Sequence, residues 1–112
     1  MKPIQWLGSS RADLKVFPAD ARRVAGFQLR LVQPGSDPND WKPLRTVGPG
    51  VREIRVHTGL EHRVVYVATF AEAVYVLHAF AKKTTRTTQR DVRIARDRFQ
   101  ALLAERRGAS GT

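Results

Sequence analysis

The hydrophobic pattern changes period near Trp41, and this change constrains the fold more than any other feature of the chain. Before Trp41 the apolar residues recur at helical spacing, and after it they alternate as in half-buried strands. The alternating part predicts three strands rich in Val, Ile, Tyr or Phe: Val51 to His57, His62 to Phe70, and Ala73 to Phe80. Because the segments between them are short, neighbouring strands are expected to pair antiparallel. A fourth, shorter strand is expected around Leu44 to Val47.

The segment before Trp41 predicts a short strand and two helices. Ile4 to Leu7 has the pattern of a strand, and Ser9 or Ser10 can cap a short helix that Pro18 stops. Pro18 also suits the first turn of a second helix, which extends to about Val32. The expected apolar positions are Ala12, Leu14, Val16 and Phe17 in the first helix and Ala21, Val24, Phe27 or Gln28, and Leu31 in the second.

The last predicted element is a C-terminal helix that begins near Thr88, where Thr88 and Asp91 resemble a capping box. Its apolar stripe consists of Val92, Ala95, Phe99 and Leu102 or Leu103, and its other face carries Arg90, Arg93, Arg96 and Arg98. Regular structure is expected to about Glu105. The order of elements predicts an α+β fold: an N-terminal strand, two helices, an antiparallel meander of three to four strands, and a C-terminal helix. We expect one domain over residues 1–106 and a flexible tail over 107–112.

Length and composition exclude several classes of protein. With 112 residues, of which 42% are hydrophobic, the chain can bury one modest core. The absence of cysteine excludes a disulfide scaffold, a thiol nucleophile, an iron–sulfur cluster and a thiolate zinc site. No apolar run approaches the roughly 18 residues of a membrane span. We therefore expect a cytoplasmic protein with no membrane partner.

The chain is strongly basic, with 20 Lys and Arg against 10 Asp and Glu and a net charge of +10. Residues 1–40 carry a net charge of +2, whereas residues 41–112 carry +8. Such an imbalance favours polyanionic partners. It is also compatible with a chain that is merely rich in arginine.

Metal and nucleotide sites are not predicted. His57, His62 and His78 lie on or beside predicted strands, where they form no helical pair and are completed by no cluster of carboxylates. Gly48-Pro49-Gly50 has neither the glycine spacing nor the Lys-Ser/Thr of a phosphate-binding loop. We expect no metal ion and no cofactor.

A group of basic side chains remains as the candidate site. Strand alternation places Glu53, Arg55 and His57 on one face. Arg63 lies on the next strand, and Glu53 is expected to form a structural ion pair with Arg55 or Arg63. The third strand carries His78 and is followed directly by the pair Lys82-Lys83.

Basic side chains without metal or paired carboxylates suit the cleavage of RNA, because RNA supplies its own 2′-hydroxyl nucleophile. The protein then has to align that hydroxyl, remove its proton and neutralise the phosphate. His78 or His57 is the ordinary candidate for the general base, with a lysine of lowered pKa as the less usual alternative. The aromatic residues Trp6, Trp41, Phe27, Phe80 and Phe99 are expected in the core rather than as platforms for bases.

Three segments resemble the RelE/HigB superfamily of bacterial toxins, in its phage-derived HigB-like branch. They are Gly50 to Val56, Arg63 to Val67, and Val76 to Thr84 followed by Thr87, Thr88, Asp91, Ala95 and Arg98. The similarity spans about residues 3–106. It implies helices on one face of an antiparallel sheet and RNA on the other face. It also implies a metal-independent endoribonuclease that cuts messenger RNA on the ribosome, and a helix-turn-helix antitoxin (HigA-like) as partner in a type II toxin-antitoxin system.

The resemblance also assigns the site. Arg55, Arg63 and Lys83 are expected to hold and stabilise the phosphate, and His78 to orient the substrate or transfer a proton. Additional RNA contacts are expected from Lys82, His57, Arg52, Arg86 and Arg90. Tyr66 matches a position of the family, but alternation places it in the core. The catalytic tyrosine near the C-terminus of the best-described RelE members is missing here.

Two alternatives remain open. The related ParE toxins inhibit DNA gyrase without any catalysis, and the same fold can do so here. A basic nucleic-acid-binding module without catalysis would also fit the charge.

Overall fold

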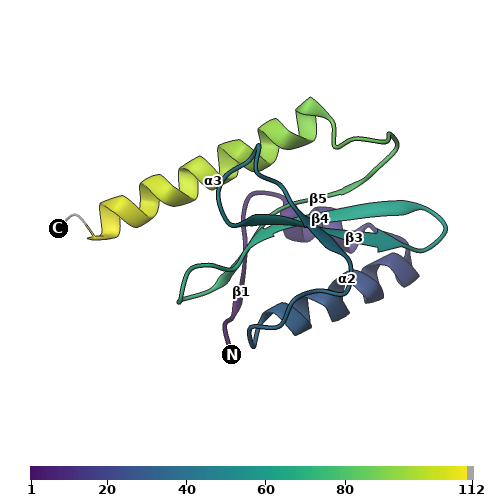
Figure 1. Cartoon of the computed structure of the whole chain (residues 1–112), viewed down its shortest axis with the longest axis horizontal. Helices are drawn as coiled ribbons and strands as arrows, with labels where there is room; N and C mark the ends of the chain where they lie inside the picture. Colours follow the sequence, from purple (N-terminus) through teal and green to yellow (C-terminus); the bar gives the residue numbers. More distant parts are fainter. Residues whose placement is uncertain (111–112) are drawn as a thin grey trace.

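Five strands form a single sheet in the order β1-β5-β4-β3-β2 in the computed structural model, which describes residues 1–110 (Figure 1). The strands are β1 Ile4–Trp6, β2 Trp41–Pro43, β3 Val51–His57, β4 Glu61–Val67 and β5 Val74–Ala81. The helices are α1 Ser10–Lys15, α2 Ala19–Val32 and α3 Gln89–Ser110. The predicted α+β order is confirmed: β2 to β5 form an antiparallel meander of four strands. In addition β1 pairs with β5 in parallel, which the sequence did not predict.

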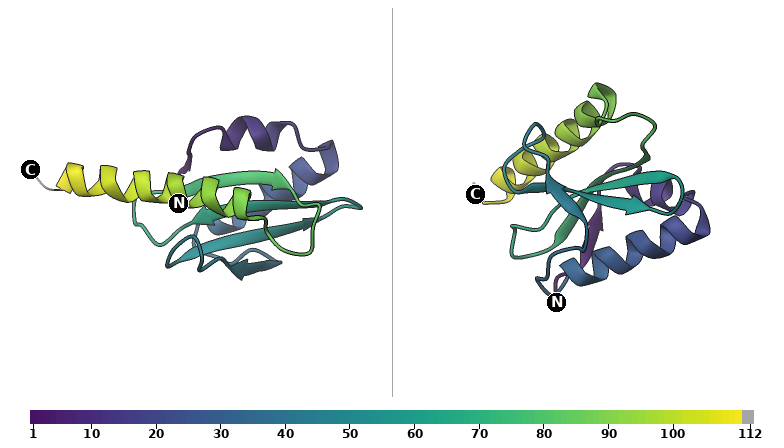
Figure 2. Two further views of the ribbon diagram at one scale, coloured as in Figure 1. Left: turned by 90° about the horizontal axis from the view of Figure 1, so that it is seen from above. Right: turned by 45° about the vertical axis from the view of Figure 1, so that its right-hand side comes forward.

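Helices lie on both faces of the sheet (Figure 2). Helices α1 and α2 cover one face of the sheet. Their residues Leu14, Ala21, Ala25 and Leu29 pack against the strand residues Ile54, Val56, Val64 and Tyr66. Helix α3 covers the opposite face. Its residues Ala95, Phe99 and Leu102 pack against the strand residues Val51, Val65 and Val67. The expectation that helices cover only one face is therefore wrong. The apolar stripe of α3 has to be buried, and it covers the apolar half of the second face.

A β-bulge interrupts the pairing of β4 with β5. Val65 is opposite His78 and Tyr66 is opposite Val76, so Leu77 is the extra residue. A bulge breaks strict alternation. As a result Leu77 packs in the core beneath α3, and its neighbour His78 also meets α3 through Asp91. The carbonyl oxygen of Leu77 accepts a hydrogen bond from Arg98 Nη1 at 2.9 Å, which fastens α3 to the bulge.

Two predicted boundaries are corrected. The fourth strand lies at Trp41–Pro43 and not at Leu44 to Val47. Leu44 and Val47 instead form a buried turn under α3, in which the Val47 N–H donates to the Leu44 carbonyl. At the C-terminus α3 continues to Ser110, so residues 107–110 of the expected tail are helical; residues 111 and 112 lie outside the described residues.

Some predicted core positions are exposed. Val16 is 82% exposed and Phe27 is 53% exposed, and Ala12 also lies at the surface. Val16 follows the end of α1, where helical spacing no longer fixes its direction. Phe80, Phe99 and Tyr66 are buried as expected. In residues 1–110 no helix is long and apolar enough to cross a membrane.

Candidate functional site

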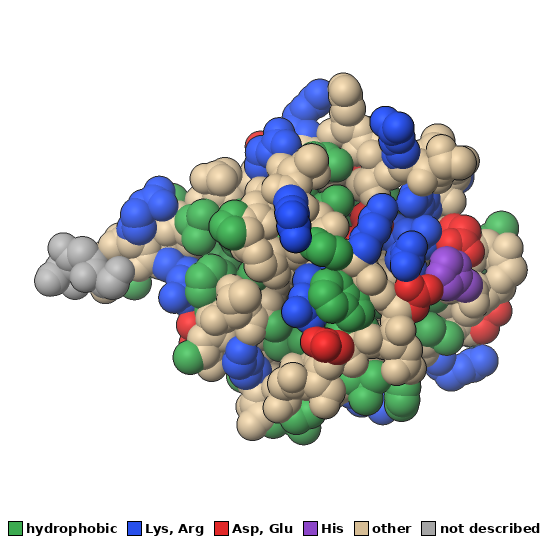
Figure 3. Space-filling view, viewed as in Figure 1, with side chains coloured by type: hydrophobic (Ala, Val, Ile, Leu, Met, Phe, Trp, Pro, Cys, Tyr) green, Lys and Arg blue, Asp and Glu red, His purple; other side chains and the backbone are tan. Residues whose placement is uncertain are grey.

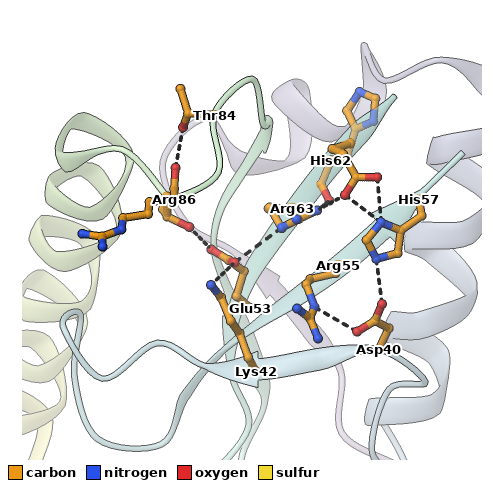
Figure 4. Close-up of polar contacts among 11 residues, drawn as sticks. Asp40, Lys42, Glu53, Arg55, His57, His62, Arg63, Thr84 and Arg86 are labelled. Carbon is orange, nitrogen blue, oxygen red and sulfur yellow. Dashed lines mark hydrogen bonds and ion pairs between the residues drawn. The ribbon is translucent and has the colours of Figure 1, made fainter. Parts of the chain in front are cut away.

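The polar half of the α3-side face is the part of the sheet that carries charged side chains. Along β3, Val51 lies under α3, whereas Glu53, Arg55 and His57 continue the same face beyond the helix. Arg55 is opposite Arg63 on β4, and Arg63 is opposite Phe80 on β5. Residues opposite one another in an antiparallel pair share a face. The register therefore brings Arg55 and Arg63 together (Figure 4).

Glu53 and Arg63 form the floor of this site. The Glu53 side chain is fully buried and that of Arg63 is 6% exposed. Arg63 Nε lies 3.5 Å from Glu53 Oε1, and Arg63 Nη1 lies 3.1 Å from Glu61 Oε1. The Thr87 hydroxyl donates to Glu53 Oε2 at 2.6 Å. Burying either charge alone would cost several kcal/mol, so each needs the other. The expected ion pair of Glu53 with Arg63 is confirmed.

The rim of the site is a chain of hydrogen bonds among exposed side chains. Arg55 Nε donates to Asp40 Oδ1 at 2.9 Å, and Asp40 Oδ2 lies 2.7 Å from His57 Nε2. His57 Nδ1 lies 2.6 Å from Glu61 Oε1. Bonds to Glu61 and Asp40 raise the pKa of His57. Both ring nitrogens are therefore occupied by carboxylates that favour the protonated ring.

Lys82 completes the group of cations. Its pKa is lowered by burial and by the charges of Arg63, Lys42 and Arg55, while Glu53 opposes the change. Lys42 reaches the site from β2, with its Nζ 3.7 Å from Glu53 Oε1. We call Lys42, Arg55, Arg63 and Lys82 the cation cluster.

Other predicted contacts lie at the margin. Lys83, Arg86 and Arg90 line a hollow of about 500 Å³ with Lys82, at the end of β5 and the start of α3. In the face shown in Figure 3, Lys and Arg side chains gather beside acidic side chains and a histidine near one end of the molecule. The structure thus places Lys83, Arg86 and Arg90 next to the cluster rather than in it.

Two expected site residues lie elsewhere. Arg52 projects from the opposite face of β3, where it stacks on Trp41 at 3.8 Å and pairs with Asp37 at 2.8 Å. Arg52 and Arg55 are three positions apart, and side chains an odd number of positions apart along a strand point to opposite faces of the sheet. His78 is buried beneath α3, its Nε2 lies 2.8 Å from Asp91 Oδ1, and burial lowers its pKa. This position does not favour proton transfer to a substrate.

The sequence reasoning missed four members of the site: Asp40, Lys42, Glu61 and Thr87. Lys42 was missed because the fourth strand was placed beyond it, so its register with Glu53 was not available. The sequence predicts that this strand begins at His62, which leaves Glu61 in the preceding connection, whereas β4 begins at Glu61 and alternation then places Glu61 on the face of Arg63. Asp40 and Thr87 lie in connections and carry no periodic signal.

The histidines do not form a metal centre in the described part of the chain. No three His, Cys, Asp or Glu side chains of residues 1–110 are grouped so as to hold a metal ion. His57 is bonded to two carboxylates, whereas His62 is buried against Phe17 on the other face of the sheet, with ring centroids 4.4 Å apart.

The fold and the cation cluster define a small α+β protein with a basic, open sheet face. The model of the family described as "Phage derived protein Gp49-like" matches residues 12–100, most of the chain. The protein belongs to this family, which is a RelE-like toxin family. A search of curated proteins found no match.

Proposed function

We propose that this chain is the toxin of a type II toxin-antitoxin pair and that it is a metal-independent endoribonuclease that cuts messenger RNA on the ribosome in the cytoplasm. The observation that carries the proposal is the cation cluster on the half of the sheet face that α3 leaves uncovered. Membership of a RelE-like toxin family supports both the toxic activity and an antitoxin partner. A helix-turn-helix antitoxin of the HigA-like kind is the proposed partner.

The cation cluster suits cleavage of an RNA phosphodiester by the RNA's own 2′-hydroxyl. The 2′-oxygen attacks the phosphorus, the bond to the 5′-oxygen breaks, and a 2′,3′-cyclic phosphate and a 5′-hydroxyl remain. Negative charge grows on the phosphate oxygens during this step, and fixed cations stabilise it. Arg55 and Lys42 have half-exposed side chains that can contact the phosphate. Arg63 lies deeper and contributes its charge from the floor.

Lys82 is the proposed general base. Burial and the neighbouring cations lower its pKa, which increases the fraction of neutral amine, the form that can accept the proton of the 2′-hydroxyl. His57 is less suited to this role, because bonds to Glu61 and Asp40 raise its pKa and engage both of its nitrogens. The departing 5′-oxygen takes its proton from solvent.

Induced expression in growing cells tests the proposal. The wild type is expected to arrest growth and to produce new 5′-hydroxyl ends in translated messages. Lys82→Ala should lower the cleavage rate by at least about 100-fold, the ordinary contribution of a general base. Lys83, in the hollow beside the cluster, is proposed to help hold the phosphate, so Arg63→Ala combined with Lys83→Ala should leave messages intact. Arg30→Ala, on the exposed side of α2, is the control and should remain toxic.

Three outcomes would contradict the proposal. The first is growth arrest that persists in the Arg63→Ala, Lys83→Ala double variant. The second is DNA breakage with undamaged transcripts, which would indicate gyrase as the target. The third is binding of nucleic acid without cleavage or toxicity.

A further inference from the structure

A second basic hollow adjoins the cation cluster and shares Lys42 with it, whereas its other lining residues have no part in the chemistry proposed above. This groove, of about 740 Å³, lies between the segment from β2 to Thr46 and the first half of α3. Its charged lining consists of Lys42, Arg86, Arg93 and Arg96, and it contains no carboxylate. Leu44 and Val92 supply apolar surface in the same lining. We call it the α3 groove.

We propose that the α3 groove binds the single-stranded RNA that flanks the cleaved linkage. The assignment of RNA rests on the proposed function. The placement beside the cleavage site rests on shared residues: Lys42 lines the groove and pairs with Glu53, and Thr87 lines the groove and donates to Glu53. A strand whose scissile phosphate lies at the cation cluster therefore enters the groove with its neighbouring nucleotides.

The groove has the chemistry that a flexible polyanion requires. Single-stranded nucleic acid is held by cations along its backbone and by surfaces on which bases can lie. Five threonines line the groove: Thr46, Thr84, Thr85, Thr87 and Thr88. The hydroxyls of Thr84, Thr87 and Thr88 already donate within the protein, whereas those of Thr46 and Thr85 can donate to a phosphate oxygen. An uninterrupted set of positive charges distinguishes this hollow from the cation cluster, in which Glu53 and Glu61 offset part of the charge.

Arg93 and Arg96, which both line the α3 groove, have different roles in it. Arg96 donates from Nε and Nη2 to the Thr46 carbonyl at 3.0 and 2.6 Å, so it fixes the groove's two sides to each other. Arg93 is exposed and forms no hydrogen bond or ion pair within residues 1–110. Its guanidinium is therefore available to a phosphate without breaking an internal contact.

The test uses 2′-O-methyl oligonucleotides of two and five nucleotides, which cannot be cleaved because the nucleophile is blocked. Titration with the full-length protein should show tighter binding of the longer oligonucleotide. Arg93→Ala should remove most of this gain. It should also reduce the slope of log affinity against log salt by about 0.7, the value for one phosphate contact on a single strand. Arg93→Lys should restore the slope, and Arg30→Ala should change neither quantity.

Cleavage measured in parallel separates this inference from the proposed function. Arg93→Ala should raise KM for messenger RNA bound to the ribosome and leave kcat unchanged, since Arg93 does not touch the reacting atoms. Binding by Arg93→Ala that equals that of the wild type would overturn the inference. So would a groove that prefers an acidic peptide to the oligonucleotides. If the wild type binds through Arg93 but cleaves nothing, the inference stands and the endoribonuclease proposal fails.

Discussion

Glu53 is a buried carboxylate whose partners come from three separate segments of the chain. Lys42 lies on β2, Arg63 on β4, and Thr87 in the connection between β5 and α3. The sequence placed Glu53 on the correct face and left open whether Arg55 or Arg63 was its partner. Arg63 is the partner because Asp40, from the loop before β2, takes the Arg55 guanidinium.

Glu53→Gln keeps the shape of the side chain but removes the charge that compensates Arg63. The free energy of unfolding is expected to fall by about 2–3 kcal/mol, because a buried cation loses its main counter-charge. Urea unfolding at neutral pH measures this loss. Glu105→Gln on the exposed side of α3 is the matched control, expected within about 0.5 kcal/mol of the wild type. Equal losses in the two variants would refute this account of the floor.

Packing of α3 on the sheet is the feature of the elements that matters most for the site. The helix covers the apolar half of its sheet face and leaves the polar half open. Close contact with the β2–β3 connection sets its position: a Cβ on Gly48 would lie 2.2 Å from Phe99 Cε2. Only a glycine permits this approach, because Phe99 is buried among Leu44, Val47 and Val51 and has no room to move.

Gly48→Ala is therefore expected to destabilise the protein by about 1–3 kcal/mol, the usual cost of overpacking a core. Gly26→Ala, in the middle of α2, is the control because nothing lies within 4 Å of its added Cβ. That substitution should stabilise the protein by up to about 1 kcal/mol through helix propensity. Thermal unfolding of both variants gives the comparison. A Gly48→Ala protein as stable as the wild type would show that α3 docks less closely than described.

At the scale of the whole molecule, the free energy of unfolding depends on pH through three histidines, and two of them act in the opposite direction to the third. Burial lowers the pKa of His62 and of His78 below the ordinary value of 6.5. The unfolded chain therefore binds more protons than the folded one as the pH falls below 6.5, and stability is lost on acidification. His57 has a raised pKa, so its contribution is present below 6.5 and is lost as the pH rises through its folded value.

Replacing these histidines should change the pH slope in opposite directions. His62→Leu is expected to reduce the loss of stability between pH 7 and pH 5, because a protonation site of the unfolded state is removed. His57→Gln is expected to make the same loss steeper, because a stabilising protonation of the folded state is removed. Urea midpoints at pH 5, 6, 7 and 8 for the three proteins measure the slopes. Parallel slopes for the two variants would contradict the assignment.

The sequence by itself determined the order and type of the elements, because long-range patterns of period two and 3.6 report which face of each element is buried. It also placed Glu53, Arg55 and His57 on one face, since alternation follows from the backbone of a strand. Only the tertiary structure decided which cations meet. Lys42 joined through the register of β2, Arg52 was directed to the opposite face with Trp41, and the bulge at Leu77 brought His78 under α3. Strand registers, bulges and helix docking depend on contacts between segments that are distant in the chain. Local periodicity cannot predict those contacts.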